Sequence, residues 1–109
     1  MQEFRKHARI KVLIPCGIRI PGGKPPDAWG HIHDISIGGV ELHTYFPMSP
    51  GDTLFLTFTV EERFQFVNVK TTVVRVRKDE GYLFSGVSFD EIVDKIHLKD
   101  AIHSLLDRE

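Results

Sequence analysis

Five residues in two short segments are suited to binding a small organic phosphate. Arg5 and Arg9 are four residues apart near the N-terminus, and Asp34, Ser36 and Gly39 follow about one hairpin later. The planar guanidinium of arginine can grip phosphate oxygens, or the O6 and N7 acceptors of guanine, through two parallel hydrogen bonds. A carboxylate can accept hydrogen bonds from the N1–H and exocyclic amine of guanine, and a hydroxyl can bond a phosphate oxygen or a base edge. This mixture favours a ligand that carries both guanine and phosphate.

Each segment also has a simpler interpretation. A basic terminal arm is usually just exposed to solvent, and Asp, Ser and Gly are the residues that commonly form tight turns. In a ligand site, Gly38 and Gly39 would leave room for backbone to approach the ligand, or would adopt positive φ. The two segments occur in order on either side of a first strand, and their combination is what predicts a ligand site.

The elements that would position these residues are mostly strands. Apolar residues occupy the even positions from Ile10 to Ile20, and this period of two predicts a half-buried strand directly after Arg9. Pro15 cannot donate a ladder hydrogen bond, so we expect this strand to lie at a barrel seam or to contain a bulge. Five further strands are predicted, over Ala28–Ile35, Gly39–Thr44, Thr53–Val60, Phe64–Lys78 and Leu83–Phe89.

The long fifth strand changes parity along its length. Val67, Val69 and Val73 are at odd positions, whereas Val74 and Val76 are at even positions. A β-bulge or a sharp bend there would allow one strand to serve two sides of a small barrel.

The pattern becomes helical after Phe89. Asp90 is the predicted N-cap, and the predicted apolar face of the helix consists of Ile92, Val93, Ile96, Ile102, Leu105 and Leu106. The chain is therefore predicted to be all-β, a six-stranded antiparallel β-barrel with one C-terminal α-helix, in which closure removes exposed strand edges. We divide the single domain, residues 1–109, into a basic N-terminal arm (1–9), a barrel (10–89) and a helix (90–108).

Length and charge restrict the class of protein. The 109 residues are enough for one domain and too few for two. The net charge of −1 argues against general adhesion to nucleic acid or to an acidic membrane. Cys16 is the only cysteine, which we expect to be buried and inert, and no apolar signal or membrane span is evident. We therefore expect a cytoplasmic protein without direct membrane insertion.

Metal binding and catalysis are both disfavoured by the spacing of the candidate residues. His31 and His33 share a strand face, but no further ligand lies at a recognisable spacing, so no metal site is predicted. Ser36 and Asp34 are too close in sequence to hold a base between them, and no Gly-x-Ser-x-Gly motif is present. We predict no catalytic residues and no enzyme activity.

One binding alternative stays open at this point. A small barrel could bind single-stranded nucleic acid by stacking bases on exposed aromatic side chains. The candidate platforms are Phe55, Phe66, Tyr82 and Phe84. Alternating phenylalanines more often belong to a core, so this is the second interpretation.

The two motifs, Arg5-x3-Arg9 and Asp34-x-Ser36-x-x-Gly39, together resemble the binding signature of the PilZ domain family, and the resemblance extends over the whole chain. It implies a receptor for the bacterial second messenger cyclic di-GMP, with Arg5, Arg9, Asp34, Ser36 and Gly39 as ligand contacts. Additional contacts are expected from Phe4, Lys6 and Gly38.

The resemblance also implies how such a receptor would work. It would be a stand-alone, single-domain receptor that needs no cofactor and signals to a separate output protein, in motility, biofilm or exopolysaccharide control. No DNA or RNA partner is expected, and self-association stays open. Many family members have an arginine immediately before the first motif arginine, associated with an intercalated ligand dimer, where this chain has Phe4. We therefore favour one ligand per protein, with the arm around Arg5 ordering on binding.

Overall fold

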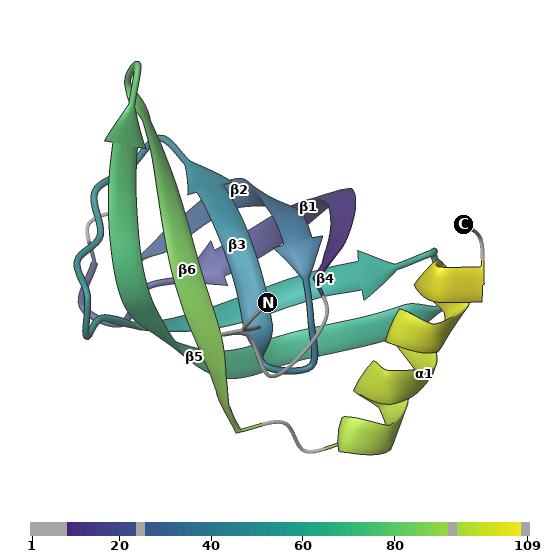
Figure 1. Cartoon of the computed structure of the whole chain (residues 1–109). Coiled ribbons are helices and arrows are strands. Elements are labelled where there is room, and N and C mark those ends of the chain that lie inside the picture. Colours follow the sequence, from purple (N-terminus) through teal and green to yellow (C-terminus); the bar gives the residue numbers. More distant parts are fainter. Residues whose placement is uncertain (1–8, 24–25, 92–93, 108–109) are drawn as a thin grey trace.

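The computed structural model describes residues 9–23, 26–91 and 94–107. Six antiparallel strands form a closed barrel in the order β1-β2-β3-β6-β5-β4, with one helix, α1, beside one end (Figure 1). This confirms the predicted fold class. Phe4, Arg5 and Lys6 lie outside the described residues. The elements are β1 (Ile10–Arg19), β2 (Asp27–Ile35), β3 (Gly39–Thr44), β4 (Thr53–Val60), β5 (Phe64–Asp79), β6 (Tyr82–Glu91) and α1 (Lys95–Asp107).

The first strand is both bulged and placed at the seam of the barrel, as Pro15 predicted. Its register with β2 shifts between Lys11 and Ile14. Among the described residues, β1 pairs with β4 only over Gly17–Arg19. Pro15, which lacks an N–H, lies two residues before this short ladder begins. The first half of β1 is therefore held mainly by β2.

Two bulges in β5 account for the change of parity that the sequence shows. At the first, Val67 and Asn68 lie between consecutive pairs with β4, and Asn68 has a φ of 50° while its amide donates to Thr57 Oγ1 at 3.0 Å. At the second, Val74 is the extra residue between the pairs that Val73 and Arg75 make with β6. The bulges confirm the prediction, and they let one strand pair with β4 along its first half and with β6 along its second.

The barrel interior is filled by alternate side chains of every strand. Its fully buried members include Ile32, Leu42, Leu54 and Leu56. Cys16 is also buried, and burial raises the pKa of its thiol to about 12, so it is an inert core residue as expected. Phe66 lies in the same core and stacks on Phe58, with ring centroids 5.0 Å apart. It is therefore not available as a platform for a nucleic-acid base.

The predicted start of the helix was wrong. Strand β6 continues to Glu91, and α1 begins at Lys95. Asp94 is the N-cap, because its Oδ1 accepts a hydrogen bond from the amide of His97 at 2.8 Å. Asp90 belongs instead to the end of β6, where it accepts a hydrogen bond from the Thr72 hydroxyl.

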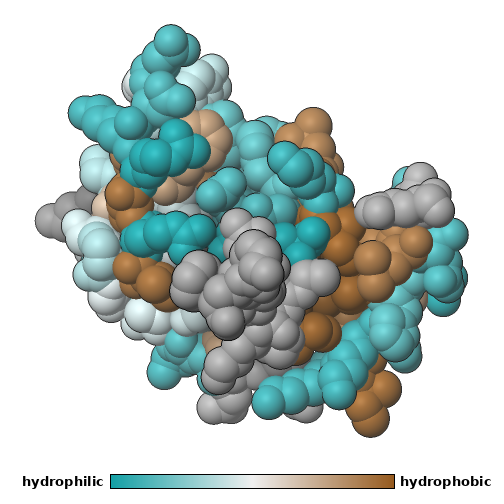
Figure 2. Space-filling view, viewed as in Figure 1, coloured by the Kyte–Doolittle hydropathy of each residue, from teal (hydrophilic) through white to brown (hydrophobic). Residues whose placement is uncertain are grey.

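The helix face that contacts the barrel also differs from the prediction. Leu98, Ala101 and Ile102 are buried, whereas Ile96 is 73% exposed and Leu106 is 44% exposed. The buried residues are spaced i, i+3 and i+4 from Leu98, which the prediction had left out. Ile92 and Val93 lie outside the described residues. Apolar side chains gather where α1 adjoins the barrel (Figure 2). No helix within the described ranges is long and apolar enough to cross a membrane.

The N-cap can be tested by substitution. Asp94→Ala should lower the free energy of unfolding by about 1 kcal/mol, because it leaves the first-turn amides of α1 without their side-chain acceptor. Asp100→Ala, at an exposed position inside the same helix, is the matched control and should be neutral or slightly stabilising. Urea denaturation followed by circular dichroism measures both. Equal stability of the two variants would contradict the assignment of the cap.

Candidate ligand-binding site

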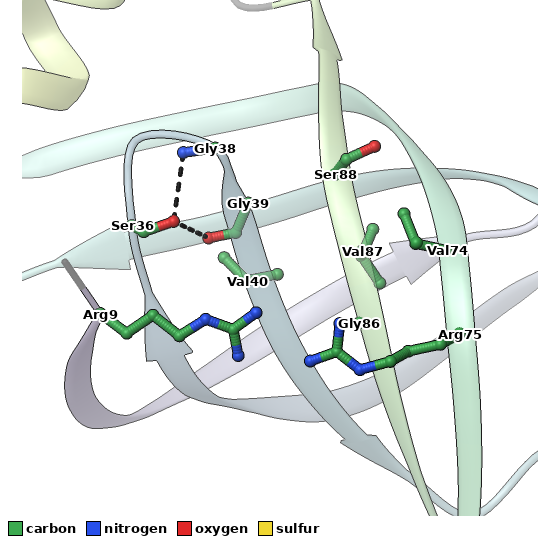
Figure 3. Close-up of a pocket in the computed structure, with 10 residues that line it drawn as sticks. All are labelled: Arg9, Ser36, Gly38, Gly39, Val40, Val74, Arg75, Gly86, Val87 and Ser88. Carbon is green, nitrogen blue, oxygen red and sulfur yellow. Dashed lines mark hydrogen bonds between the residues drawn. The ribbon is translucent and has the colours of Figure 1, made fainter. Parts of the chain in front are cut away.

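The predicted site residues that the structure describes meet on the outside of the barrel. An open pocket of about 200 Å³ is formed by the residue before β1, the β2–β3 turn and neighbouring positions of β3, β5 and β6 (Figure 3). Its lining consists of Arg9, Ser36, Gly38, Gly39, Val40, Val74, Arg75, Gly86, Val87 and Ser88. Strand pairing brings these segments together although they are up to 79 residues apart, since 88 − 9 = 79.

Arg9 and Asp34 are the charged pair that links the two motifs. Arg9 Nη1 lies 3.4 Å from Asp34 Oδ2, and the two side chains are 25% and 18% exposed. Asp34 reaches this position because it pairs with Lys11 across β1 and β2, next to the start of β1. At this distance and exposure the pair contributes at most about 1 kcal/mol to stability. The carboxylate holds Arg9 at the pocket and the pair can still exchange partners for a ligand.

The turn from Ser36 to Gly39 is closed by its own hydrogen bonds. The Ser36 amide donates to the Gly39 carbonyl at 2.9 Å, and the Ser36 hydroxyl accepts from the Gly38 amide at 3.1 Å. The Gly38 carbonyl in turn accepts from the amide of Phe89 at 3.0 Å. Ser36 is buried and its hydroxyl already has a structural role, with one side facing the pocket.

The reason for Gly39 differs from the one that the sequence suggested. Neither Gly38 nor Gly39 is among the glycines with positive φ. A Cβ on Gly39 would lie 2.0 Å from the Val87 carbonyl oxygen and 3.0 Å from Ser88 Cα. Glycine is required at position 39 because β6 approaches so closely. The predicted positive φ is wrong for both glycines, and the other predicted reason, room for a ligand, stays a prediction.

Sequence reasoning missed a second arginine in the pocket. Arg75 of β5 extends across Gly86 of β6, and in Figure 3 its guanidinium points toward that of Arg9. A motif could not reveal this residue, because it lies 66 positions after Arg9 (75 − 9 = 66) and reaches the pocket only through strand order. The signal available in the sequence was the parity change at Val74, directly before it.

A row of aromatic and histidine side chains adjoins the pocket on the outer face. His43 stacks on Phe84 with centroids 4.5 Å apart, and its Nδ1 lies 3.0 Å from His33 Nε2. Tyr82 and Tyr45 extend the row, with their hydroxyls 3.1 Å apart. Within the described ranges, no three His, Cys, Asp or Glu side chains are grouped so as to hold a metal ion.

The environment of His43 makes stability depend on pH. Burial lowers the pKa of His43 below its ordinary value of 6.5, and nearby His33 and His31 act in the same direction. The folded state therefore favours the neutral ring. The contribution of His43 to the free energy of unfolding is fully present above pH 6.5, and it is lost below that value as His43 of the unfolded chain takes up a proton. His43→Gln should lose less stability than the wild type between pH 7 and pH 5.

The control for this prediction is His103→Gln, at an exposed position of α1. Thermal denaturation at several pH values measures the effect. His103→Gln should keep the wild-type dependence on pH, and an unchanged dependence in His43→Gln would contradict the assignment.

A closed six-stranded barrel whose outer pocket joins an arginine, a carboxylate and a glycine turn defines a class of ligand-binding domain. The PilZ domain family matches residues 3–107, and the chain belongs to this family. No curated protein matches the sequence.

Solved structures share the fold at low sequence identity. The Bacillus subtilis inhibitor of motility MotI/DgrA has a TM-score of 0.75 and 16% identity, covering 99% of this chain and 54% of that chain. Escherichia coli YcgR in complex with c-di-GMP has a TM-score of 0.77 and 13% identity, and the match covers 97% of this chain and 47% of that chain. The PilZ domain of Escherichia coli YcgR with c-di-GMP has a TM-score of 0.74 and 12% identity, and the match covers 97% of this chain and 93% of that chain. The chain thus spans about half the length of the first two and nearly all of the isolated domain.

Proposed function

We propose that this chain is a receptor for cyclic di-GMP and not an enzyme. The observation that carries the proposal is the ion pair between Arg9 and Asp34 beside the Ser36–Gly39 turn, at one pocket. Membership of the PilZ domain family and the complexes of the YcgR domain with this ligand support it.

Each side chain has a chemical role in this proposal. Arg9 donates two hydrogen bonds to a phosphodiester or to the O6 and N7 acceptors of a guanine. Asp34 accepts from the N1–H and amine of a guanine once Arg9 turns toward the ligand. The Ser36 hydroxyl offers a further polar contact at the floor of the pocket.

The pocket's size bears on the predicted arm. Its volume of about 200 Å³ is below the roughly 300–1,000 Å³ of small-molecule sites. A cyclic dinucleotide needs more surface than this pocket provides, and we infer that Arg5, with Phe4 and Lys6 as further contacts, supplies it. Ordering such an arm costs about 1–2 kcal/mol per residue fixed, which the charge-assisted bonds must exceed.

The output would be read by a separate protein. Ligand binding would place the arm against the barrel and so create or cover a surface beside the β2–β3 turn. Motility, biofilm and exopolysaccharide control are the outputs that we propose, and the likeness to the inhibitor of motility MotI/DgrA supports the first of them.

Calorimetric titration of the full chain with cyclic di-GMP tests the proposal. We expect micromolar or tighter binding of one ligand per chain, and much weaker binding of GMP, which has a single guanine and no cyclic diester. Absence of binding to cyclic di-GMP in the micromolar range would contradict the receptor. A stoichiometry of two would contradict only the inference from Phe4.

A further inference from the structure

Arg75 is placed in the pocket by an irregularity of its strand. Val73 is buried and Val74 is the bulged residue, so Val74 and Arg75 both lie on the outer surface. In a regular strand these two consecutive residues would point to opposite faces. Bulges are often found where a side chain must be redirected beside a functional site. Here the bulge directs Arg75 over β6 toward the turn.

The strand opposite Arg75 leaves space for it. Arg75 pairs with Gly86, and a Cβ at Gly86 would lie 2.9 Å from both Cζ and Nη1 of the Arg75 guanidinium. Gly86 has no positive φ that would require glycine. The missing side chain therefore serves to let the guanidinium lie flat over β6, at the wall of the pocket.

Ion pairing distinguishes Arg75 from Arg77 on the same strand. Within the described part of the chain, no carboxylate lies within ion-pair distance of Arg75. Arg77, two residues along the same face, differs in this respect: its Nη1 lies 3.6 Å from Asp79 Oδ2, and its Cζ lies 4.5 Å from the centroid of the Phe84 ring. The two arginines share a strand and a charge, but Arg77 has an ion-pair partner and an aromatic contact of its own, whereas Arg75 is directed over Gly86 toward the pocket.

Arg9 and Arg75 face each other from opposite walls of the pocket (Figure 3). Two like charges directed at one space repel each other, and an anion between them adds two attractions that offset this repulsion. Arg9 is partly neutralised by Asp34, so Arg75 brings the uncompensated positive charge to the pocket.

We propose that Arg75 is a ligand-binding residue that grips a phosphodiester of the ligand from the wall opposite Arg9. This inference rests on the proposed function, and it adds a contact outside the two sequence motifs. Gly86 is its positioning residue, because it keeps the space into which the guanidinium extends.

Calorimetric titration of the full chain with cyclic di-GMP, at low and at moderate salt, tests this role. Arg75→Ala should weaken binding at least tenfold and should reduce the dependence of affinity on salt, because one charged contact to phosphate is lost. The affinity of Arg75→Lys should lie between those of the wild type and Arg75→Ala, since lysine keeps the charge without the bidentate geometry of a guanidinium. Arg77→Ala is the matched control and should bind within twofold of the wild type.

Gly86→Ala provides a second test that depends on geometry. It should weaken binding in the wild-type background, because the added methyl group displaces the Arg75 guanidinium, and it should have no further effect when combined with Arg75→Ala. Circular dichroism checks that each variant is folded.

The outcomes separate this inference from the proposed function. If the wild type binds and Arg75→Ala binds within twofold of it, Arg75 is not a contact and the receptor proposal stands. If Arg77→Ala weakens binding as much as Arg75→Ala, general positive charge and not a specific contact explains the effect, which overturns the inference. If the wild type does not bind, both are overturned.

Discussion

Gly39→Ala is expected to destabilise the barrel by at least about 4 kcal/mol, a loss found only for severe structural disruption. Its Cβ would lie 2.0 Å from the Val87 carbonyl oxygen, well inside contact distance. This oxygen and Ser88 Cα, the other atom close to the added Cβ, are backbone atoms of β6, and Gly39 pairs directly with Ser88. Relief would require β3 and β6 to separate and would break the ladder that also carries the pocket.

Gly17→Ala is the matched control for this prediction. Gly17 also lies inside a strand, but the nearest atoms to its added Cβ would be 3.8 Å away. We expect it to change the free energy of unfolding by less than about 1 kcal/mol. Urea denaturation followed by circular dichroism measures both variants, and a Gly39→Ala protein as stable as the wild type would show that our account of this glycine is wrong.

This prediction changes how a ligand-binding defect at Gly39 should be interpreted. A variant that fails to bind because its β3–β6 ladder is broken gives no information about ligand contacts. Binding by Gly39 variants is therefore informative only alongside a measurement of folding, whereas Arg9 and Asp34 can be tested directly.

Asp34→Ala is expected to weaken cyclic di-GMP binding at least 100-fold while leaving the barrel folded. The proposed contacts of this carboxylate are charge-assisted hydrogen bonds to a guanine edge, which contribute about 1.5–3 kcal/mol each. The variant also frees Arg9, whose Nη1 lies 3.4 Å from Asp34 Oδ2. Because the pair is partly exposed, its loss should cost at most about 1 kcal/mol of stability. Arg9→Ala should have a similar effect on binding.

The same two strands provide a matched control pair. Arg19 and Asp27 face each other at the other end of the β1–β2 ladder, 3.6 Å apart and 61% and 71% exposed. Asp27→Ala removes the same charge and the same kind of ion pair far from the pocket, and it should bind like the wild type. Calorimetry measures all of these variants. If Asp34→Ala bound as tightly as Asp27→Ala, the site would have to lie elsewhere.

The barrel was predictable because its signal is local. Period-two alternation and turn residues predicted the ends of five strands within one residue and those of the sixth within two, and the parity change indicated the bulges in β5. The sixth was longer than predicted. The helix start was missed because Asp90 and Asp94 are both good N-caps, and only the pairing of β6 with β5 decides between them.

The candidate site was only partly predictable, for a spatial reason. Arg9, Asp34, Ser36 and Gly39 stand in short motifs. In the structure Arg9, Ser36 and Gly39 line one pocket, and Asp34 forms an ion pair with Arg9. Arg75 and Arg77 look equivalent in the sequence, since both alternate with valines, and their difference depends on a bulge and on Gly86. These features appear only when β5 and β6 are paired. Arg5 stays a prediction, because it lies outside the described residues.

The short β1–β4 seam has a mechanical consequence. Where few ladder bonds hold a strand, it opens at a lower free energy than the rest of the structure. We therefore expect local opening in the first half of β1, which directly follows Arg9 and borders a cleft of about 580 Å³ shared with Leu105 of α1. A ligand that binds Arg9 should therefore reduce the local opening of this segment of β1, which lies beside α1.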